Sequence, residues 1–475
     1  MNIPNMNNFR GLFRILFLSI AIVLIASFSF ASVAVEKILP AVPEILPDKK
    51  NIEKDMVASI AADTEISQEK DAANSKKPVE AFESAADHPK SDVVRDEAKV
   101  SSGDSSLNKE TVSPLGESYS SNKTAIKAID KNIVLFRDRL KERFSIWLER
   151  SARYLDIMKD ILREKELPEE LVFLPIVESG FNLNAYSSAR AVGPWQFMSA
   201  TARRYGLVID WWKDERKDPV KSTQAAADYL KDLYKMFGSW NLALAAYNAG
   251  EGRIAKALKR SDSDDYWSLL HTKQIRNETK EYVPRYIAAT MIANTPEDYG
   301  FYNLAYHEPL EFDEVLLNSP LDIDVIAVCA DTTVKEIRDL NPELRRWSTP
   351  PGLSHYVIRI PKGTKKIFNE NLAEIPEDEQ FSIETYKAKK GDNLKKIAKK
   401  VGVPVNAILA MNSMSGIEKI DAGEKIKIPP KDKYQPDIDD KATARKAAYK
   451  KKAGKKKSSK KSRKGHAKKS KGKKA

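Results

Sequence analysis

Residues 166–181 read ELPEELVFLPIVESGF, and this stretch decides how the chain is interpreted. A proline followed by two glutamates is typical of the start of a helix, where acids face the positive end of the helix dipole. Leu171, Leu174 and Glu178 then recur at helical spacing, so they are expected on one face. The stretch therefore predicts a helix that carries Glu178 on its apolar side and ends at Gly180.

The position of Glu178 suggests a chemical role for its carboxyl group. Burial disfavours the charged form of a carboxylate, and so does the negative C-terminal end of a helix. Both effects raise the pKa and favour a proton donor near neutral pH, as a general acid requires. A buried glutamate can also simply cap or brace a core, and the stretch alone leaves that alternative open.

Three further motifs follow in the chain. Residues 191–207 read AVGPWQFMSATARRYGL, residues 243–254 read ALAAYNAGEGRI, and residues 278–289 read ETKEYVPRYIAA. In this order and spacing, after the ESGF of the first stretch, they resemble the soluble lytic transglycosylase domain, a goose-lysozyme-like fold that cleaves peptidoglycan. The resemblance covers about residues 125–295 and is closest to the membrane-bound transglycosylase D type, in which LysM repeats follow the catalytic domain.

The resemblance implies a fold and a reaction. The expected fold class is mainly α, with a lysozyme-like catalytic domain at 121–300 followed by small βααβ LysM modules. The expected reaction breaks the β-1,4 bond between N-acetylmuramic acid and N-acetylglucosamine and leaves a 1,6-anhydro-muramic acid end. Glu178 would be the catalytic acid and base, because the muramoyl 6-hydroxyl supplies the attacking oxygen. A hydrolysing muramidase and a non-catalytic wall-binding protein are the alternatives.

The resemblance also implies substrate-binding roles for residues in and near these motifs: Ser187, Gln196, Met198, Tyr247, Asn248, Glu278 and Tyr282. Ser187 and Gln196 match positions that hydrogen-bond sugar and peptide-bearing groups. Met198 and Phe197 would form an apolar wall that keeps Glu178 protonated, although plain core packing is the alternative for Met198.

The two later motifs would line the rest of the cleft. Tyr247 would lie within reach of the catalytic carboxylate, and Asn248 would contact an N-acetyl group. Glu278 and Tyr282 are four residues apart, so they share a helix face; a purely structural role remains open for Glu278. Trp195 departs from the usual Leu or Met of the family and is expected to alter a subsite wall.

Other polar residues give weaker signals. Asp218 precedes a proline and is expected to be a helix N-cap. Asp210, Asp214 and Glu215 are interpreted as a solvated loop. The five histidines are scattered without a pair at ligand spacing, so no metal or other cofactor is expected.

Two segments near the C-terminus resemble LysM modules. Residues 382–430 are expected to form a βααβ unit, with Asp392 as the N-cap of its first helix and Gly402 as its stop. Residues 309–362 are interpreted as a diverged copy because IRIP at 358–361 echoes IKIP at 426–429. This copy carries an insertion near 345–353, and a packing spacer without sugar binding is the alternative for both copies.

The first third of the chain suggests export. An apolar run at residues 15–34 follows two arginines and ends in small residues, which predicts a signal peptide over 1–34 and a location in the periplasm or cell envelope. An uncleaved membrane anchor is the alternative. Residues 35–120 are poor in aromatic residues and are predicted to be a disordered linker. From 121 onward, apolar residues at three- and four-residue steps predict one long amphipathic helix through about Leu162.

The net charge of +13 belongs to the C-terminal tail. Residues 441–475 hold 18 Lys plus Arg and no acid, which leaves a net charge of −5 on the remainder. The tail, within a basic segment at 431–475, is predicted to be disordered and to contact anionic envelope polymers. A specific nucleic-acid partner is not expected because aromatic residues are not interleaved with the cations. The expected main partner is the glycan strand of peptidoglycan.

Overall fold

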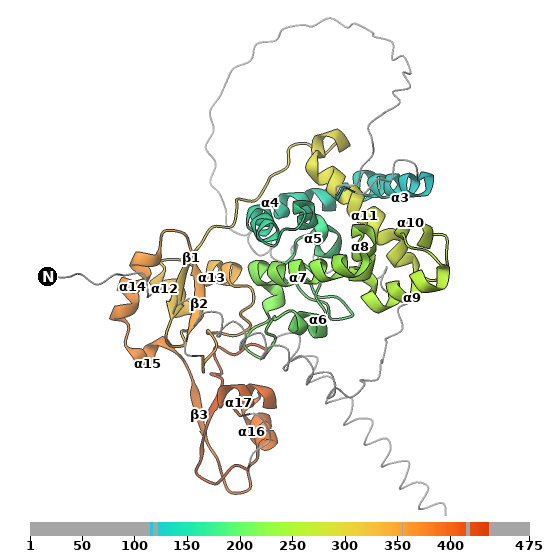
Figure 1. Cartoon of the computed structure of the whole chain (residues 1–475). Coiled ribbons are helices and arrows are strands. Elements are labelled where there is room, and N and C mark those ends of the chain that lie inside the picture. The colour runs from blue at the N-terminus through green and yellow to red at the C-terminus, as the bar shows by residue number, and fades with distance from the viewer. Residues whose placement is uncertain (1–114, 117–121, 354, 415–418, 437–475) are drawn as a thin grey trace, which may run out of the picture. The chain divides into compact units, whose positions relative to one another are not determined.

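The computed structural model describes residues 115–116, 122–353, 355–414 and 419–436. The predicted signal peptide, nearly all of the predicted linker and the basic tail lie outside the described residues. Within the described ranges, no helix is long and apolar enough to cross a lipid bilayer. The elements of the described part are mainly helical, as predicted (Figure 1).

The N-terminal part of the described chain, through residue 301, is built from helices. Its elements are α3 (Lys123–Val134), η2 (Leu135–Arg139), α4 (Lys141–Glu164), η3 (Glu169–Phe173), α5 (Leu174–Ser179), α6 (Ser199–Arg204), η4 (Glu215–Lys217), α7 (Pro219–Phe237), α8 (Trp240–Ala249), α9 (Glu251–Ser261), α10 (Tyr266–Leu269), α11 (Asn277–Asn294) and η5 (Pro296–Tyr299).

The long helix predicted up to Leu162 is interrupted. A π-helical turn, η2, separates α3 from α4, and Leu140 at its end leaves helical geometry with φ −116° and ψ 19°. The break turns Phe136 against Phe144, with ring centroids 4.6 Å apart, and both rings are buried. The apolar stripe was identified correctly, but a repeat of three- and four-residue steps does not show where a helix takes an extra residue in one turn.

The core of this part surrounds α8. Most side chains of α8 are buried, as expected for a helix that is apolar on nearly all sides. Helices α7, α9 and α11 pack against it, and α5 packs against α11 (Figure 1). The short helix that carries Glu178 is thus fixed against the helix that carries Glu278 and Tyr282.

Residues 313–374 contain the βααβ unit predicted for the first LysM-like copy. Strand β1 (Asp313–Leu317) pairs antiparallel with β2 (Tyr356–Ile360), with Val315 opposite Ile358. Helices α12 (Ile323–Cys329) and α13 (Val334–Leu340) lie between the strands in sequence, and α14 (Lys365–Glu374) and α15 (Glu377–Gln380) follow.

The second copy has the same order of elements. Strands β3 (Glu384–Lys387) and β4 (Lys425–Ile428) pair antiparallel, and α16 (Leu394–Val401) and α17 (Val405–Met411) lie between them in sequence. Gly402 ends α16 in the left-handed conformation, as predicted. The N-cap prediction was wrong by one residue: Asn393 caps α16, while Asp392 accepts hydrogen bonds from Tyr386 and Lys400.

Candidate active site

Glu178 lies in the last turn of α5, as the opening stretch predicted, although η3 before it is a 3-10 helix rather than part of the same α-helix. Gly180 ends α5 with φ 58°. A Cβ atom at this glycine would lie 2.3 Å from the Trp147 ring, so both the backbone conformation and the available space require glycine. The sharp turn after Glu178 is therefore a direct consequence of sequence.

The carboxyl group of Glu178 is half-buried and has a phenol as its neighbour. Tyr282 of α11 donates a hydrogen bond to Glu178 Oε1 at 2.5 Å. Burial raises the pKa of Glu178 to about 7, the charge of Glu278 acts in the same direction, and the Tyr282 hydrogen bond and the charge of Arg285 oppose the rise. Near neutral pH, the side chain can thus both donate and accept a proton.

Tyr247 lies close enough to be influenced by this carboxylate. Burial raises the pKa of Tyr247 well above its ordinary value, and the charge of Glu178 adds to the effect. Its hydroxyl donates to the Trp195 carbonyl at 2.8 Å, and its ring packs against Phe197 with centroids 6.4 Å apart. The phenol of Tyr282, rather than that of Tyr247, is the one hydrogen-bonded to Glu178.

Trp195 does not form a subsite wall, contrary to the prediction. Its side chain is 0% exposed, and its indole Nε1 donates to Thr223 Oγ1 of α7 at 2.9 Å. The larger ring was accommodated because an interior hydroxyl satisfies its N–H, which an apolar interior alone could not do.

A polar cluster joins the AYNAG motif to α11. Thr279 Oγ1 donates to Asn248 Oδ1 at 3.1 Å, and Asn248 Nδ2 donates to Glu278 Oε1 at 3.4 Å. These contacts fix the amide of Asn248 and the carboxylate of Glu278 relative to each other. Glu278 therefore has a structural contact, while its charge still acts on Glu178.

The remaining predicted residues lie on the loop before α6. Ser187 Oγ accepts from the Ala191 backbone N–H at 2.9 Å, and Gln196 Nε2 donates to the Gly193 carbonyl at 2.8 Å. Both side chains hold the loop itself, and no hydrogen bond within the described residues links either one to Glu178. Met198 is 47% exposed, so plain core packing is wrong for it.

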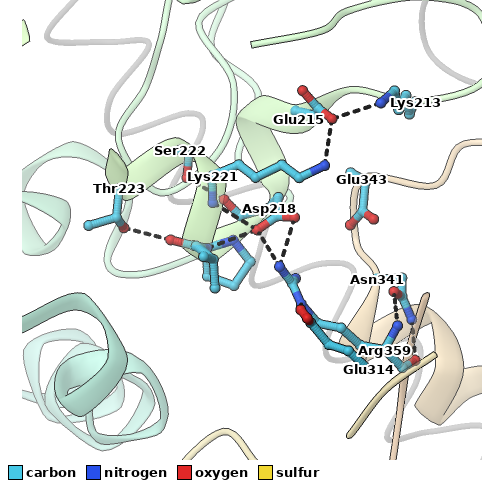
Figure 2. A network of polar contacts seen from close by, with 12 residues as sticks. Lys213, Glu215, Asp218, Lys221, Ser222, Thr223, Glu314, Asn341, Glu343 and Arg359 are labelled. Carbon is cyan, nitrogen blue, oxygen red and sulfur yellow. Dashed lines mark hydrogen bonds and ion pairs between the residues drawn. The ribbon is translucent and has the colours of Figure 1, made fainter. Parts of the chain in front are cut away.

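The acidic loop interpretation was wrong for two residues. Asp214 and Glu215 are buried, and only Asp210 of the three is exposed. Arg216 donates to both carboxylate oxygens of Asp214, at 2.9 and 2.7 Å. Glu215 accepts from Lys213 and Lys221 (Figure 2). Alternation of acids with Lys and Arg in this segment was the available signal for internal ion pairing.

The N-cap prediction for Asp218 is confirmed but incomplete. Asp218 accepts from the backbone N–H groups of Val220 and Lys221 at the start of α7. It also forms an ion pair with Arg359 of β2, which no local pattern indicated because the two residues are far apart in the sequence (Figure 2).

Three segments of the chain match known protein families, in the same order as the parts described above. Residues 157–270 match the transglycosylase SLT domain, residues 311–377 match the LysM-like domain of lytic transglycosylase MltD, and residues 386–429 match the LysM domain. The chain carries a transglycosylase SLT domain followed by two LysM-type domains. The family resemblance stated from the four sequence motifs is therefore confirmed.

Curated relatives extend the similarity beyond the SLT domain. Membrane-bound lytic murein transglycosylase D of Escherichia coli strain K12 is 33% identical over 294 residues, which cover 59% of this chain and 64% of the relative. The chain thus spans less than two thirds of that relative. A putative tributyltin chloride resistance protein of Alteromonas sp. strain M-1 is 39% identical over 115 residues, covering 24% of this chain and 56% of the relative.

Solved structures with a similar part include two lytic transglycosylases. The 70 kDa soluble lytic transglycosylase of Escherichia coli is 24% identical, with a TM-score of 0.28, and the match covers 37% of this chain and 30% of that one. An inactive mutant of lytic transglycosylase Slt from Pseudomonas aeruginosa is 23% identical, with a TM-score of 0.26, and the match covers 32% of this chain and 25% of that one.

Proposed function

We propose that this protein is a peptidoglycan lytic transglycosylase. It cleaves the β-1,4 bond between N-acetylmuramic acid and N-acetylglucosamine and forms 1,6-anhydro-muramic acid, while LysM holds it on the wall. The observation that carries the proposal is the half-buried Glu178, whose pKa is raised to about 7 and whose carboxyl oxygen accepts from Tyr282. The SLT domain around it supports this choice of reaction.

One carboxyl group can serve both steps of this reaction. Protonated Glu178 first gives its proton to the glycosidic oxygen as the bond to C1 breaks. The resulting carboxylate then removes the proton of the muramoyl 6-hydroxyl, whose oxygen closes onto C1, so the proton count of the enzyme is restored. The nucleophile belongs to the same sugar, which gives it a high effective concentration without a positioned water molecule.

The Tyr282 phenol suits the second of these states. A hydroxyl donor stabilises the charged carboxylate more than the neutral acid. It therefore moderates the rise in pKa that burial causes and keeps both protonation states of Glu178 accessible. The groups predicted to contact substrate, including Ser187, Gln196 and Asn248, would then hold the sugars against this pair.

A hydrolysing muramidase is the second candidate, because Glu278 provides a second carboxylate whose charge acts on Glu178. Many glycosidases use two carboxylates, one as acid and one to activate water or attack. In this structure Glu278 Oε1 accepts from Asn248. We assign Glu278 to the positioning of Asn248 at the end of α8 rather than to activation of water.

The substrate would be reached in the cell envelope. An exported chain with a wall-binding LysM domain encounters peptidoglycan glycan strands, and the basic tail would add contacts with anionic polymers there. Export by the predicted signal peptide remains part of this proposal.

The test is digestion of purified peptidoglycan sacculi by the full chain, with mass analysis of the soluble fragments. The proposal expects fragments that each lack one water relative to hydrolysis products. Glu178→Gln, which keeps the side-chain volume, is the matched control and should release no fragments. Fragments with reducing muramic ends from the unmodified chain would establish the muramidase alternative instead.

A further inference from the structure

A buried ion pair joins the SLT domain to the LysM-like domain. Arg359 Nη2 lies 3.2 Å from Asp218 Oδ1 and 3.1 Å from Oδ2, and the two side chains are 7% and 1% exposed (Figure 2). A buried ion pair loses much hydration on folding, so its geometry must be precise to be tolerated. The two partners therefore fix the position of β2 relative to the start of α7.

The backbone of Arg359 is itself held in place. Asn341 Oδ1 accepts from the Arg359 N–H at 2.9 Å, and Asn341 Nδ2 donates to the Arg359 carbonyl at 2.7 Å. The main chain nearby also bridges the two domains, since the Asp214 N–H donates to the Glu343 carbonyl at 2.9 Å. The backbone that carries the Arg359 guanidinium is thus held in place on both sides by Asn341.

Asp218 links the ion pair with Arg359 to the start of α7. Its Oδ1 accepts from the Val220 and Lys221 N–H groups at 2.8 and 3.0 Å, so the carboxylate that meets Arg359 also caps the helix. One turn later, Thr223 Oγ1 accepts from the indole of Trp195. The N-terminal end of α7, from Asp218 to Thr223, therefore connects the domain interface with the interior of the loop that carries Trp195.

The loop that carries Trp195 contacts Tyr247, which lies near Glu178. The carbonyl of Trp195 accepts from the hydroxyl of Tyr247, whose pKa is raised partly by the charge of Glu178. A second support comes from Arg216, which donates to the Phe197 carbonyl at 3.1 Å. At Gly193 a Cβ atom would lie 1.8 Å from the Arg216 carbonyl oxygen, so the loop rests directly on this segment.

We propose that Arg359 is a positioning residue for the transglycosylase reaction, and that the LysM-like domain forms part of the catalytic unit. Through Asp218, α7 and Trp195, it sets the position of Tyr247 beside Glu178. This inference rests on the proposed function, because it concerns the rate of that reaction. It assigns the 311–377 domain a role in catalysis that does not require it to bind sugar.

The experiment compares Arg359→Met with Lys362→Met in the full chain. Lys362 is a matched control, since it follows β2 by two residues but is 63% exposed and lies 3.6 Å from Asp313. Kinetics are measured on short soluble glycans well below the unfolding temperature of each variant, together with pelleting on sacculi. Arg359→Met should lower kcat by about 10- to 100-fold, the range expected when catalytic groups shift by about 1 Å, with pelleting within about twofold. Lys362→Met should match the unmodified chain.

Two further variants separate positioning from simple damage. Asp218→Asn with Arg359→Met removes both charges of the ion pair, so neither partner is left charged without the other, and the variant is expected to fold and to keep the kcat deficit. Thr223→Val breaks the link inside the SLT domain and should lower kcat in the same direction. Arg359→Lys, which keeps a cation, should recover part of the rate.

Two results would overturn the inference. One is a kcat for Arg359→Met or for the double variant within about twofold of the unmodified chain, even if its unfolding temperature fell. The other is a loss of kcat in Arg359→Met that the double variant fully restores, because a lone buried charge would then explain the defect. Failure of the proposed function itself would be distinguishable, since the unmodified chain would then release no anhydro fragments.

Discussion

The carboxyl group of Glu178 is balanced between two opposing effects. Burial raises its pKa, and the hydroxyl of Tyr282 lowers it by hydrogen bonding to the ionised form. The result, a pKa of about 7, suits a group that must donate and then accept a proton during one turnover.

Replacing Glu178 by Gln should abolish turnover and leave the fold intact. Glutamine keeps the shape and hydrogen-bonding capacity but cannot shuttle a proton, so kcat should fall by on the order of 10³ or more, because both steps use the same group. Turnover is measured on sacculi, and circular dichroism and pelleting serve as controls. Activity within about tenfold of the unmodified chain would mean that another acid does the work.

Replacing Tyr282 by Phe should shift the pH dependence of the reaction. The rate requires protonated Glu178, so kcat/KM should decline as pH rises through about 7. Because the Tyr282 hydrogen bond lowers the pKa of Glu178, its removal raises that pKa and should move the decline to higher pH. A kcat/KM profile from pH 5 to 9 checks this, and a shift to lower pH would contradict the assigned role of the phenol.

Part of the candidate site was predictable from local patterns. Helical spacing and a glycine stop predicted the place of Glu178 at the end of a helix, whereas Tyr282 was named because the family resemblance implied it. The buried pairing of Asp214 with Arg216 and of Asp218 with Arg359 was missed. Alternating charges indicated that Asp214 could pair with Arg216 but not that the pair would be buried. The partner of Asp218 lies on a distant segment, and burial by such a segment leaves no periodic signal around the residues themselves. Trp195 was misplaced for the same reason, since its partner Thr223 lies on another element.

At the scale of elements, α5 depends on how it ends. This helix is short, and Gly180 both reverses the chain and leaves room for the Trp147 ring. The βααβ order of the LysM-type domains was also predictable from turn residues. The π-helical break at η2 was not predictable, because the apolar residues before and after it follow the same three- and four-residue spacing.

Gly180→Ala should destabilise the protein and reduce its activity together. Alanine at φ 58° costs about 1 kcal/mol in backbone strain, and displacement of the Trp147 ring adds to that, so a loss of roughly 2–4 kcal/mol is expected. Urea unfolding measures the loss. Gly206→Ala is the control, because it also has positive φ but no atom within 4 Å of the added Cβ. Equal losses in the two variants would show that the contact with Trp147 is unimportant.

At the scale of the whole molecule, the LysM domain shares its apolar core with residues from elsewhere. Trp211 and Trp212 of the SLT loop and Trp347 of the LysM-like domain cluster with Ile397 and Ile408 of LysM. The catalytic core around α8 forms a separate cluster. Binding to the wall and catalysis should therefore be separable, but not without exposing these aromatic rings.

Truncation after residue 380 should weaken pelleting on sacculi by about tenfold or more, because a linked binding domain raises the local concentration of the enzyme at its substrate. Cleavage of short soluble glycans should stay within about threefold, since the separate catalytic core is retained. The exposed tryptophans should increase self-association, which light scattering can detect. Unchanged pelleting of the truncated chain would show that the LysM domain does not anchor the enzyme.

In the proposed reaction the attacking oxygen comes from the sugar and not from water. Digestion of sacculi in water enriched in heavy oxygen tests this claim directly, because hydrolysis places a solvent oxygen on C1 of the new muramic end. Mass spectrometry should find no heavy oxygen in the released ends, each of which should be lighter than the hydrolysis product by one water. Heavy oxygen at those ends, in fragments released by the unmodified chain but not by Glu178→Gln, would contradict it.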